Sequence, residues 1–259
     1  MDLSITNRKA LVCASSKGLG RACAVSLAQA GCDVTINGRD AATLDQAVRE
    51  IEAETGAKVQ GVQADINTPE GREALLAACP DADILVNNNA GPTPGDFLKW
   101  SQDDWTEALN SNMFVALDLI KNVAPGMRER KFGRIVNITS AVVKSPRAHQ
   151  TLSTAARTGL TAACKALSLI YVVDNVTINN LLPERFETGR QEFMTRKIMD
   201  ADGVSYDEAR KKISDTIAAK RFGLPAEFGD TCAFVCSAQA GFMSGQNIQL
   251  DGGSYAGLI

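Results

Sequence analysis

The segment RIVNITSAVVKSPRAHQTLSTAARTGL, residues 134–160, decides the fold. Its first part, 135–139, is an apolar and largely β-branched run that predicts a buried strand. Ser140 follows where this strand should end, and a serine–proline pair then marks a loop. From Ser153 onward apolar residues recur at helical spacing, and residues four apart on a helix share a face, so Ser153 and Arg157 should project together. Open α/β sheets place their binding sites at such strand ends.

The same alternation of strand and helix runs through the whole chain. Strands are expected at 10–13, 34–36, 59–62, 84–86, 135–139, 176–178 and 247–250, and helices at 18–30, 41–54, 69–78, 103–130, 153–173 and 226–237. Strands that alternate with helices form a parallel sheet through right-handed crossovers. The sequence therefore predicts the α/β class, with a single Rossmann-type doubly wound parallel sheet of about seven strands and helices on both faces.

The chain shows no repeat, low-complexity segment or linker, so residues 1–259 are expected to form one dinucleotide-binding catalytic domain. Segment 187–222 is the exception to the alternation, because it is amphipathic, rich in charge and without a strand. It precedes the last helix–strand unit, and we expect a helical lid over the ligand crevice. The alternative is a solvated helical hairpin without function.

Composition excludes several classes of protein. The net charge of -3 and pI near 5.4 give no reason to expect a nucleic acid or an anionic membrane as partner. No apolar run approaches the roughly 20 residues that span a bilayer, and the first residues do not resemble a signal peptide. The seven cysteines include no CxxC pair; Cys232 and Cys236 are interpreted as core residues, and no metal site is expected. A reduced, cytoplasmic protein is the prediction.

A glycine-containing turn lies between the first expected strand and the first helix. Glycines here let the backbone approach a pyrophosphate, while the helix amino terminus supplies N–H donors and partial positive charge. The pattern is not GxGxxG, and its position in the first strand–helix turn is what supports it. The candidate cofactor-binding residues of this turn are Ser15, Ser16, Lys17, Gly18, Leu19 and Gly20.

The residues after the second strand bear on the choice between NADP and NAD. An acidic residue ending this strand would accept hydrogen bonds from the adenosine ribose, but Gly38 and Arg39 stand there. Arg39 and Lys17 favour NADP, since arginine binds phosphate in a forked geometry. Asp40 is the counter-signal, although it also suits a helix cap. Asp65, followed by Ile66 after the third strand, could accept from the adenine amino group or simply form a turn.

With these residues collected, the whole chain resembles the short-chain dehydrogenase/reductase family, especially its 3-oxoacyl-carrier-protein-reductase-like members. The family's TGxxxGxG appears with Ala14 in place of the first glycine, and its NNAG is intact at 88–91. The closing SGQ…DGG is present at 244–253. The resemblance implies cofactor contacts from Asn89, Ala90, Gly91, Arg157 and Thr188, and it aligns the family's helix asparagine with Asn112 and its catalytic serine with Ser140. The Thr188 element departs from the family's PG…T pattern, because Glu184 replaces the glycine.

The family's YxxxK motif does not carry over, because Ser153 stands at the tyrosine position and Arg157 at the lysine position. In the usual mechanism a phenol with a lowered pKa exchanges a proton with the carbonyl oxygen as hydride moves. Arg157 can keep the electrostatic part of this role but cannot act as an acid. Ser140 and Ser153 could polarise a carbonyl as an oxyanion hole does. His149 could relay a proton through water or be a plain loop residue.

Three hypotheses follow. The leading one is an NADP(H)-dependent oxidoreductase that interconverts a carbonyl and a secondary alcohol, with Asn112, Ser140, Ser153 and Arg157 as catalytic residues. The alternatives are a cofactor-binding protein with little catalysis, and dehalogenase- or lyase-like chemistry on the same fold. Lys144, Tyr206 and Tyr255 are weaker candidates for the missing proton donor. The substrate should be a small molecule that the sequence does not identify, and the family's pairing of its long helices predicts a homo-oligomer, a tetramer or dimer.

Overall fold

The structure is a computed structural model and describes residues 1–258. Within this range one sheet of seven parallel strands has the order β3-β2-β1-β4-β5-β6-β7. The strands are β1 (Lys9–Val12), β2 (Asp33–Gly38), β3 (Val59–Gln63), β4 (Ile84–Asn87), β5 (Gly133–Ile138), β6 (Val176–Pro183) and β7 (Asn247–Leu250). The strand order reverses between β1 and β4, and in such sheets the ligand crevice opens at the carboxyl ends near this point. The predicted fold class is confirmed.

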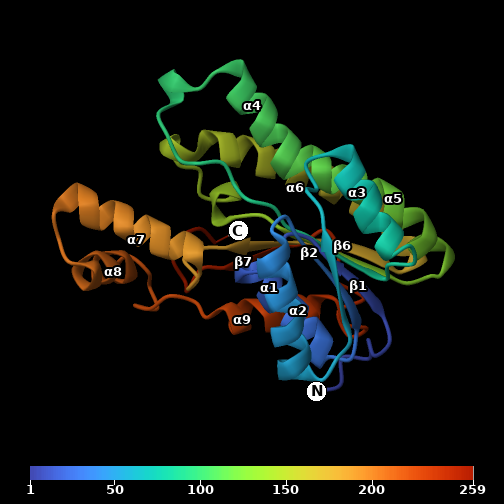
Figure 1. Ribbon diagram of the computed structural model, residues 1–259. Coiled ribbons are helices and arrows are strands. Elements are labelled where there is room, and N and C mark those ends of the chain that lie inside the picture. Colours follow the sequence, from blue (N-terminus) through green and yellow to red (C-terminus); the bar gives the residue numbers. More distant parts are fainter. Residues whose placement is uncertain (259) are drawn as a thin grey trace.

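Helices cover both faces of the sheet (Figure 1). One face carries α1 (Gly18–Gln29), α2 (Ala41–Thr55) and α9 (Pro225–Val235), and the other carries α3 (Pro69–Ala78), α5 (Val115–Glu129) and α6 (Thr151–Tyr171). Each face has its own apolar core, with Phe228 fully buried in the first and Leu119 in the second. All six residues of β5 are buried, as expected for a strand covered on both sides. This strand carries the functional segment at its carboxyl end.

The long helix expected at 103–130 is confirmed, because residues 102–129 are helical without a break, but it contains an unexpected π turn. It consists of α4 (Gln102–Leu109), the π-helical segment η2 (Asn110–Phe114) and α5. A π turn holds one more residue than an α turn, and such single-turn insertions are frequent at functional sites. Asn112 lies inside it and is buried. Apolar periodicity does not reveal the insertion, because both flanking helices keep their own regular spacing.

Segment 187–222 is helical, as expected. It contains α7 (Gly189–Asp202) and α8 (Tyr206–Asp215), which stand away from the sheet beyond the carboxyl ends of the strands (Figure 1). Ile213 of α8 forms a small separate apolar cluster with Ile217 and Phe222, against which Ile198 of α7 packs. The two helices border a hollow of about 790 Å³ with Ile198 and Ile213 in its lining. Closure over a ligand remains a prediction.

Helix α6 spans two environments. Its inner face is buried through Ala156, Leu160 and Cys164 and packs on β6. By length and composition alone, residues 148–174 could cross a membrane, a property that core helices of globular folds share. Beyond the last buried turn, Leu169 and Ile170 are exposed. The helix therefore presents apolar side chains both to the core and to the outside.

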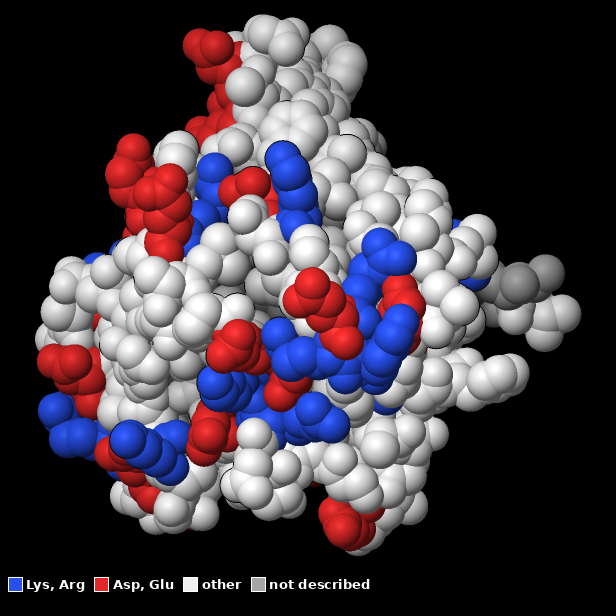
Figure 2. Space-filling view, turned by 90° about the vertical axis from the view of Figure 1, so that its right-hand side faces the viewer, with Lys and Arg blue, Asp and Glu red and all other residues white. Residues whose placement is uncertain are grey.

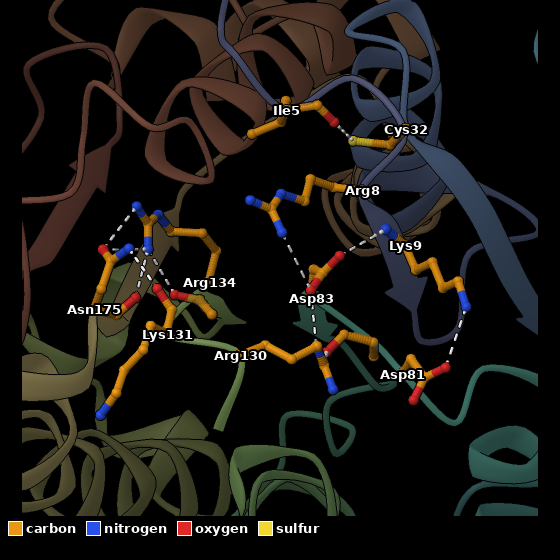
Figure 3. A network of polar contacts seen from close by, with 12 residues as sticks. Ile5, Arg8, Lys9, Cys32, Asp81, Asp83, Arg130, Lys131, Arg134 and Asn175 are labelled. Carbon is orange, nitrogen blue, oxygen red and sulfur yellow. Dashed lines mark hydrogen bonds and ion pairs between the residues drawn. The ribbon is translucent and has the colours of Figure 1, made fainter. Parts of the chain in front are cut away.

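Charged side chains of both signs gather at the amino ends of the strands. Figure 2 shows them interleaved on this face, and Figure 3 shows the contacts. Asp83 accepts a hydrogen bond from Arg130 at 3.3 Å and pairs with Arg8 at 3.7 Å. Arg134, only 1% exposed, donates to the Ser237 carbonyl and to Asn175. Because these charges are paired within the network, we interpret this end of the sheet as structural.

Candidate active site

The turn between β1 and α1 leaves backbone donors open toward solvent. Lys17 is the N-cap of α1, no side chain caps the helix, and its first turn holds no acidic residue. Gly18 has φ +63°, and a Cβ added there would meet nothing within 4 Å. At Gly20 an added Cβ would lie 2.6 Å from the Ala14 carbonyl oxygen. Free N–H groups, open space and a nearby lysine fit a phosphate group.

Other residues of this turn hold its shape. The Ser15 hydroxyl is fully buried, donates to the Val12 carbonyl at 2.6 Å and accepts from the Asn37 N–H at 3.0 Å. Ser15 therefore fixes the turn from inside. Leu19 packs on the core below, whereas Ser16 stands close to Gly38, where an added Cβ would lie 3.1 Å from the serine. Of the six predicted residues, Lys17 is exposed and Ser16 and Gly18 are half-buried, whereas Gly20 is buried against the Ala14 carbonyl.

Asp40, the residue that argued against NADP, forms hydrogen bonds within the protein. Its carboxylate accepts from the Thr43 hydroxyl and from the Thr43 N–H at 2.9 Å, and so caps α2. These hydrogen bonds, with a smaller effect of Lys17, lower the pKa of Asp40. Arg39 extends into solvent with 71% of its side chain exposed. The end of β2 therefore offers an exposed guanidinium and a carboxylate already engaged in capping.

Asp65 also serves its own turn. Its Oδ1 accepts from the Asn67 N–H at 3.0 Å and from the Asn67 side chain at 2.9 Å, while Oδ2 lies 4.0 Å from Arg39 Nη1. Ile66 is buried, and its carbonyl accepts from Arg72. The turn interpretation of Asp65 fits this geometry, and 39% of its side chain stays accessible to a ligand.

The NNAG segment joins β4 to the π-helical segment. Asn89 donates from Nδ2 to the Asn67 side chain at 2.8 Å and to the Ser111 carbonyl at 2.9 Å. Asn112 donates to the Ala90 carbonyl at 3.3 Å. The Oδ1 atom of Asn112 is buried and accepts from no described residue. A buried acceptor without a partner costs free energy, so this oxygen suits a donor on a ligand or a bound water.

Arg157 and Ser153 lie together, as their spacing predicts. The Arg157 Nε donates to Ser153 Oγ at 3.2 Å, and Nη1 donates to the carbonyls of Ile138 and Thr139 at 2.8 and 2.9 Å. Nη2 has no hydrogen-bond partner within residues 1–258, and it lies 3.1 Å from the place where Gly91 would carry a Cβ. The guanidinium is thus anchored beneath the end of β5 with one nitrogen left toward the NNAG segment.

The charge of Arg157 is isolated from acids. The side chain is 8% exposed and forms no ion pair with a described carboxylate. Burial, and then the charge of Arg190, lower its pKa from 12.5 to about 10. That value still leaves the group cationic at neutral pH. A fixed positive charge at this depth can stabilise negative charge that develops on a substrate oxygen.

Ser140 and Thr188 follow neighbouring strands at the same end of the sheet. Ser140 is the N-cap of η3 (Ala141–Val143), with its Oγ accepting from the Val142 N–H at 3.3 Å. Thr188 is the N-cap of α7 and its Oγ1 lies 3.5 Å from the Phe186 carbonyl. Because β5 and β6 are adjacent, both hydroxyls border the carboxyl end of the sheet.

One cluster in this region escapes sequence reasoning. Glu184, which stands at the family's glycine position, is 10% exposed and pairs with Arg147 and with Arg185, the latter at 3.3 Å. Arg147 comes from the loop after β5, so the cluster joins the loops that follow β5 and β6. Arg185 has φ +58°. The only signal in the sequence is the replaced glycine, because residues 37 positions apart give no local pattern.

His149 lies on η4 (Ala148–Gln150), and its side chain is exposed. Its carbonyl accepts from the Gly95 N–H at 3.0 Å, which agrees with the loop interpretation. Within the described part of the chain, no group of three or more His, Cys, Asp or Glu side chains is placed to hold a metal ion. The seven cysteines are buried and unbridged.

The chain is similar to known reductases over nearly its whole length. A family model described as enoyl-(acyl carrier protein) reductase matches residues 13–255. The 3-oxoacyl-[acyl-carrier-protein] reductase of Aquifex aeolicus is 30% identical over 259 residues, covering 98% of this chain and all of that one. The NADPH-dependent reductase BacG of Bacillus subtilis is 29% identical over 255 residues, 96% of this chain and 98% of the other. The crystal structure of L-sorbose reductase from Gluconobacter frateurii, complexed with NADPH and L-sorbose, superimposes with a TM-score of 0.94 at 26% identity over the full length of both.

Proposed function

The chain belongs to the short-chain dehydrogenase/reductase family, and from this premise we propose that it interconverts a carbonyl and a secondary alcohol with NADP(H). It is an oxidoreductase of that family whose site lacks the usual tyrosine. One observation carries the proposal, namely the guanidinium of Arg157 anchored by the carbonyls of Ile138 and Thr139 and bonded to Ser153. The charge of the family's lysine is kept at this position although its partner phenol is gone.

NADP(H) is the cofactor that this site fits. Its pyrophosphate would lie against the uncapped start of α1, and Lys17 and Arg39 would meet the phosphate on the adenosine ribose. Asp40 does not oppose this, since its carboxylate caps α2. The related BacG is named as NADPH-dependent, and the L-sorbose reductase structure holds NADPH. Asn112 Oδ1 and Thr188 would complete the contacts toward the nicotinamide half.

In the reaction, bound NADPH supplies the hydride to the carbonyl carbon. We propose that Ser140 and Ser153 donate hydrogen bonds to the carbonyl oxygen. Arg157 stabilises the negative charge that grows there as the carbon is reduced, because a buried cation acts through a medium of low polarity. None of these three groups is an acid near neutral pH. Catalysis by positioning and electrostatics alone is typically 10²–10⁴-fold slower than with a general acid.

The first experiment measures cofactor binding and turnover separately. Calorimetry should detect NADPH binding that is tighter than NADH binding, and Arg39→Ala should weaken NADPH binding about tenfold or more while leaving NADH binding nearly unchanged. Arg49→Ala, which removes an exposed arginine from α2, is the matched control. Oxidation of NADPH is then followed against a panel of ketones, aldehydes and keto sugars. Failure to bind either nucleotide would refute the proposal.

Tight binding of NADPH without any turnover would instead favour the cofactor-binding alternative. The observation behind this alternative is that the buried contacts of Arg157 include no titratable acid among the described residues. The double variant Ser153→Tyr with Arg157→Lys separates the two outcomes. A slow enzyme should gain turnover on receiving the missing acid, whereas a protein without a productive substrate site should stay inactive.

We further propose that the protein works in the cytoplasm on a small molecule. The support is its set of seven free thiols, all buried, which is typical of reducing compartments. Fractionation of expressing cells tests the location, since the protein should remain with the soluble fraction. We also propose that the protein is a homo-oligomer, and the exposed apolar side chains at the end of α6 support this.

A further inference from the structure

The first turn of α7 gathers hydrogen-bond donors that have no acceptor within the protein. Thr188 is its N-cap, and no side chain caps the helix. The N–H groups of Gly189 and Arg190 donate to no described residue. A Cβ added at Gly189 would meet nothing within 4 Å, so the start of the helix borders open space. Free N–H groups and the positive end of a helix dipole attract an anion.

Two side chains of this turn add to these donors. Arg190 is exposed and forms no ion pair or hydrogen bond within residues 1–258, and its guanidinium lies 5.8 Å from the centre of the Phe193 ring. Gln191 is 9% exposed, and its buried Nε2 has no hydrogen-bond partner among the described residues. An unpaired buried donor costs free energy, and an acceptor on a ligand would remove this cost.

The carboxylates near the start of α7 are already paired. Glu187 binds Arg210, and Glu192 accepts a hydrogen bond from Arg196 at 2.7 Å. Glu184, at the end of β6, is held by the two arginines described above. None of these three acids therefore offsets the unpaired guanidinium in the first turn of the helix.

A second cation lies within electrostatic range of this turn. The charge of Arg190 contributes to the lowered pKa of Arg157, so the two guanidinium groups act on each other. Arg157 is 8% exposed, and its Nη2 has no hydrogen-bond partner among residues 1–258. Like charges repel, and no described carboxylate pairs with either group. An anion bound close to both would replace this repulsion by attraction.

These donors lie apart from the place expected for the pyrophosphate of the cofactor. The pyrophosphate should lie at the start of α1, which follows β1, whereas α7 follows β6 and leaves the sheet beyond its carboxyl ends (Figure 1). Three strand spacings of about 4.8 Å, roughly 14 Å in all, separate β1 from β6. Arg157 and Ser153 lie between them, at the end of β5. The start of α7 therefore borders the place where we propose that the carbonyl is reduced.

We infer that the start of α7 binds an anionic group of the substrate, a carboxylate or a phosphate, and that Arg190 recognises this group. The inference rests on the proposed function and adds the class of substrate to it, namely a carbonyl compound that carries an acidic group. A guanidinium binds either anion through two parallel N–H donors. Gln191 and the free N–H groups of the turn supply donors for the remaining oxygens of the anion.

The first test measures binding without turnover. The complex with NADP⁺ has no hydride to transfer to a carbonyl, so calorimetry on this complex reports affinity alone. The probes are two matched pairs, acetoacetate with its methyl ester and dihydroxyacetone phosphate with dihydroxyacetone. At least one anion should bind about tenfold tighter than its neutral partner, and the pair that differs more distinguishes carboxylate from phosphate. Equal affinities within both pairs, including no detectable binding, overturn the inference.

The second test changes the recognising residue. Arg190→Gln should weaken binding of the preferred anion about 10–100-fold, because a charge-assisted hydrogen bond is lost, while the affinity for the neutral partner changes little. Arg196→Gln is the matched control, since it removes another exposed arginine of α7, and it should change neither affinity. If Arg190→Gln instead weakens NADP⁺ binding and keeps the preference for the anion, Arg190 belongs to the cofactor site and the inference is wrong.

A third variant separates binding from folding. Gln191→Leu replaces an unpartnered buried amide by an apolar group, so stability in urea should stay equal or rise while binding of the anion weakens. A purely structural role of Gln191 predicts unchanged binding. A protein that binds the anion but never oxidises NADPH with any carbonyl compound would contradict the proposed function and leave the anion site standing, so the two failures are distinguishable.

Discussion

At the scale of the residue, Arg157 holds a charge where solvent scarcely reaches. Its donors meet the carbonyls of Ile138 and Thr139, whose partial charges replace the counter-ion that a buried cation would normally need. The pairing of Arg157 with Ser153 could be predicted from their spacing on a helix. The use of backbone carbonyls could not, because carbonyls carry no sequence signal. The same is true of the unpartnered Asn112 oxygen.

Ala14 is a second residue of interest, because its backbone conformation costs free energy. It takes the family's first glycine position and has φ +44°, in the left-handed region that a Cβ disfavours. Replacing it by glycine should relieve this strain. Part of the gain is offset, because glycine also makes the unfolded chain more flexible and so raises its entropy. We expect Ala14→Gly to raise the free energy of unfolding by about 0.5–1 kcal/mol. Urea denaturation followed by circular dichroism measures it.

Ala22→Gly is the matched control for this change. Ala22 lies in the middle of α1 with ordinary helical geometry, so glycine there should cost about 1 kcal/mol. The two substitutions should therefore move stability in opposite directions. Equal losses for both variants would show that position 14 carries no backbone strain.

At the scale of the element, β5 and the loop after it could be predicted, whereas the π turn within the helix before it could not. The buried strand and its following loop are readable because apolar runs and Ser-Pro pairs reflect local physics. The π-helical segment at Asn110–Phe114 is not readable, since its stability comes from contacts with the NNAG segment and α6. The Glu184 cluster could not be predicted for a similar reason, because its members come from different loops.

An ion pair at the start of helix α9 should make the stability of the fold depend on pH in the acid range. Glu227 at its start is gripped by both terminal nitrogens of Arg221 and accepts from the Leu224 N–H. The arginine, and then this N–H, lower the pKa of Glu227 from 4.5 to about 2. A carboxyl whose folded pKa is depressed stabilises the fold above its unfolded pKa, and this contribution is lost as pH falls from about 4.5 toward 2.

The pair is largely solvent-exposed, so screening limits the effect to about 1 kcal/mol. Denaturation at pH 7 and pH 3 should therefore show a smaller loss of stability for Glu227→Gln than for the wild type. Glu192→Gln, which removes an exposed pair with Arg196 inside α7, is the control and should keep the wild-type pH dependence. An identical pH dependence of Glu227→Gln and the wild type would contradict the assignment.

At the scale of the whole molecule, the two ends of the sheet differ in their polar groups. Paired charges close the amino end, whereas free donors and the isolated guanidinium collect at the carboxyl end. This division could be predicted, because strand–helix alternation determines where all parallel strands end. Strand and helix limits shift by at most two residues from expectation, as at α9 and α6, since periodicity does not define caps; the exception is β6, which runs to Pro183 where the strand was expected to end at residue 178.

The outer end of α6 predicts self-association. Leu169 and Ile170 of α6 are 70 and 56% exposed, and Val173 in the turn that follows, η5 (Val172–Asp174), is 81% exposed. Together they make an exposed apolar surface, which is unfavourable in water. We expect light scattering to report a dimer or tetramer of the 27.5 kDa chain. Ile170→Glu with Val173→Glu should dissociate it, whereas Ala53→Glu, on α2 at the other face, should not. A wild-type protein that is monomeric at micromolar concentration would refute the expectation.

The anchored guanidinium also limits how this lineage can change. A tyrosine arriving alone at position 153 would remove the hydrogen bond from Arg157 and meet a cation already committed to two carbonyls. A lysine arriving alone at 157 would leave Ser153 without its donor. Neither single substitution alone produces the family's tyrosine–lysine pair, so a change to that pair requires two coordinated mutations.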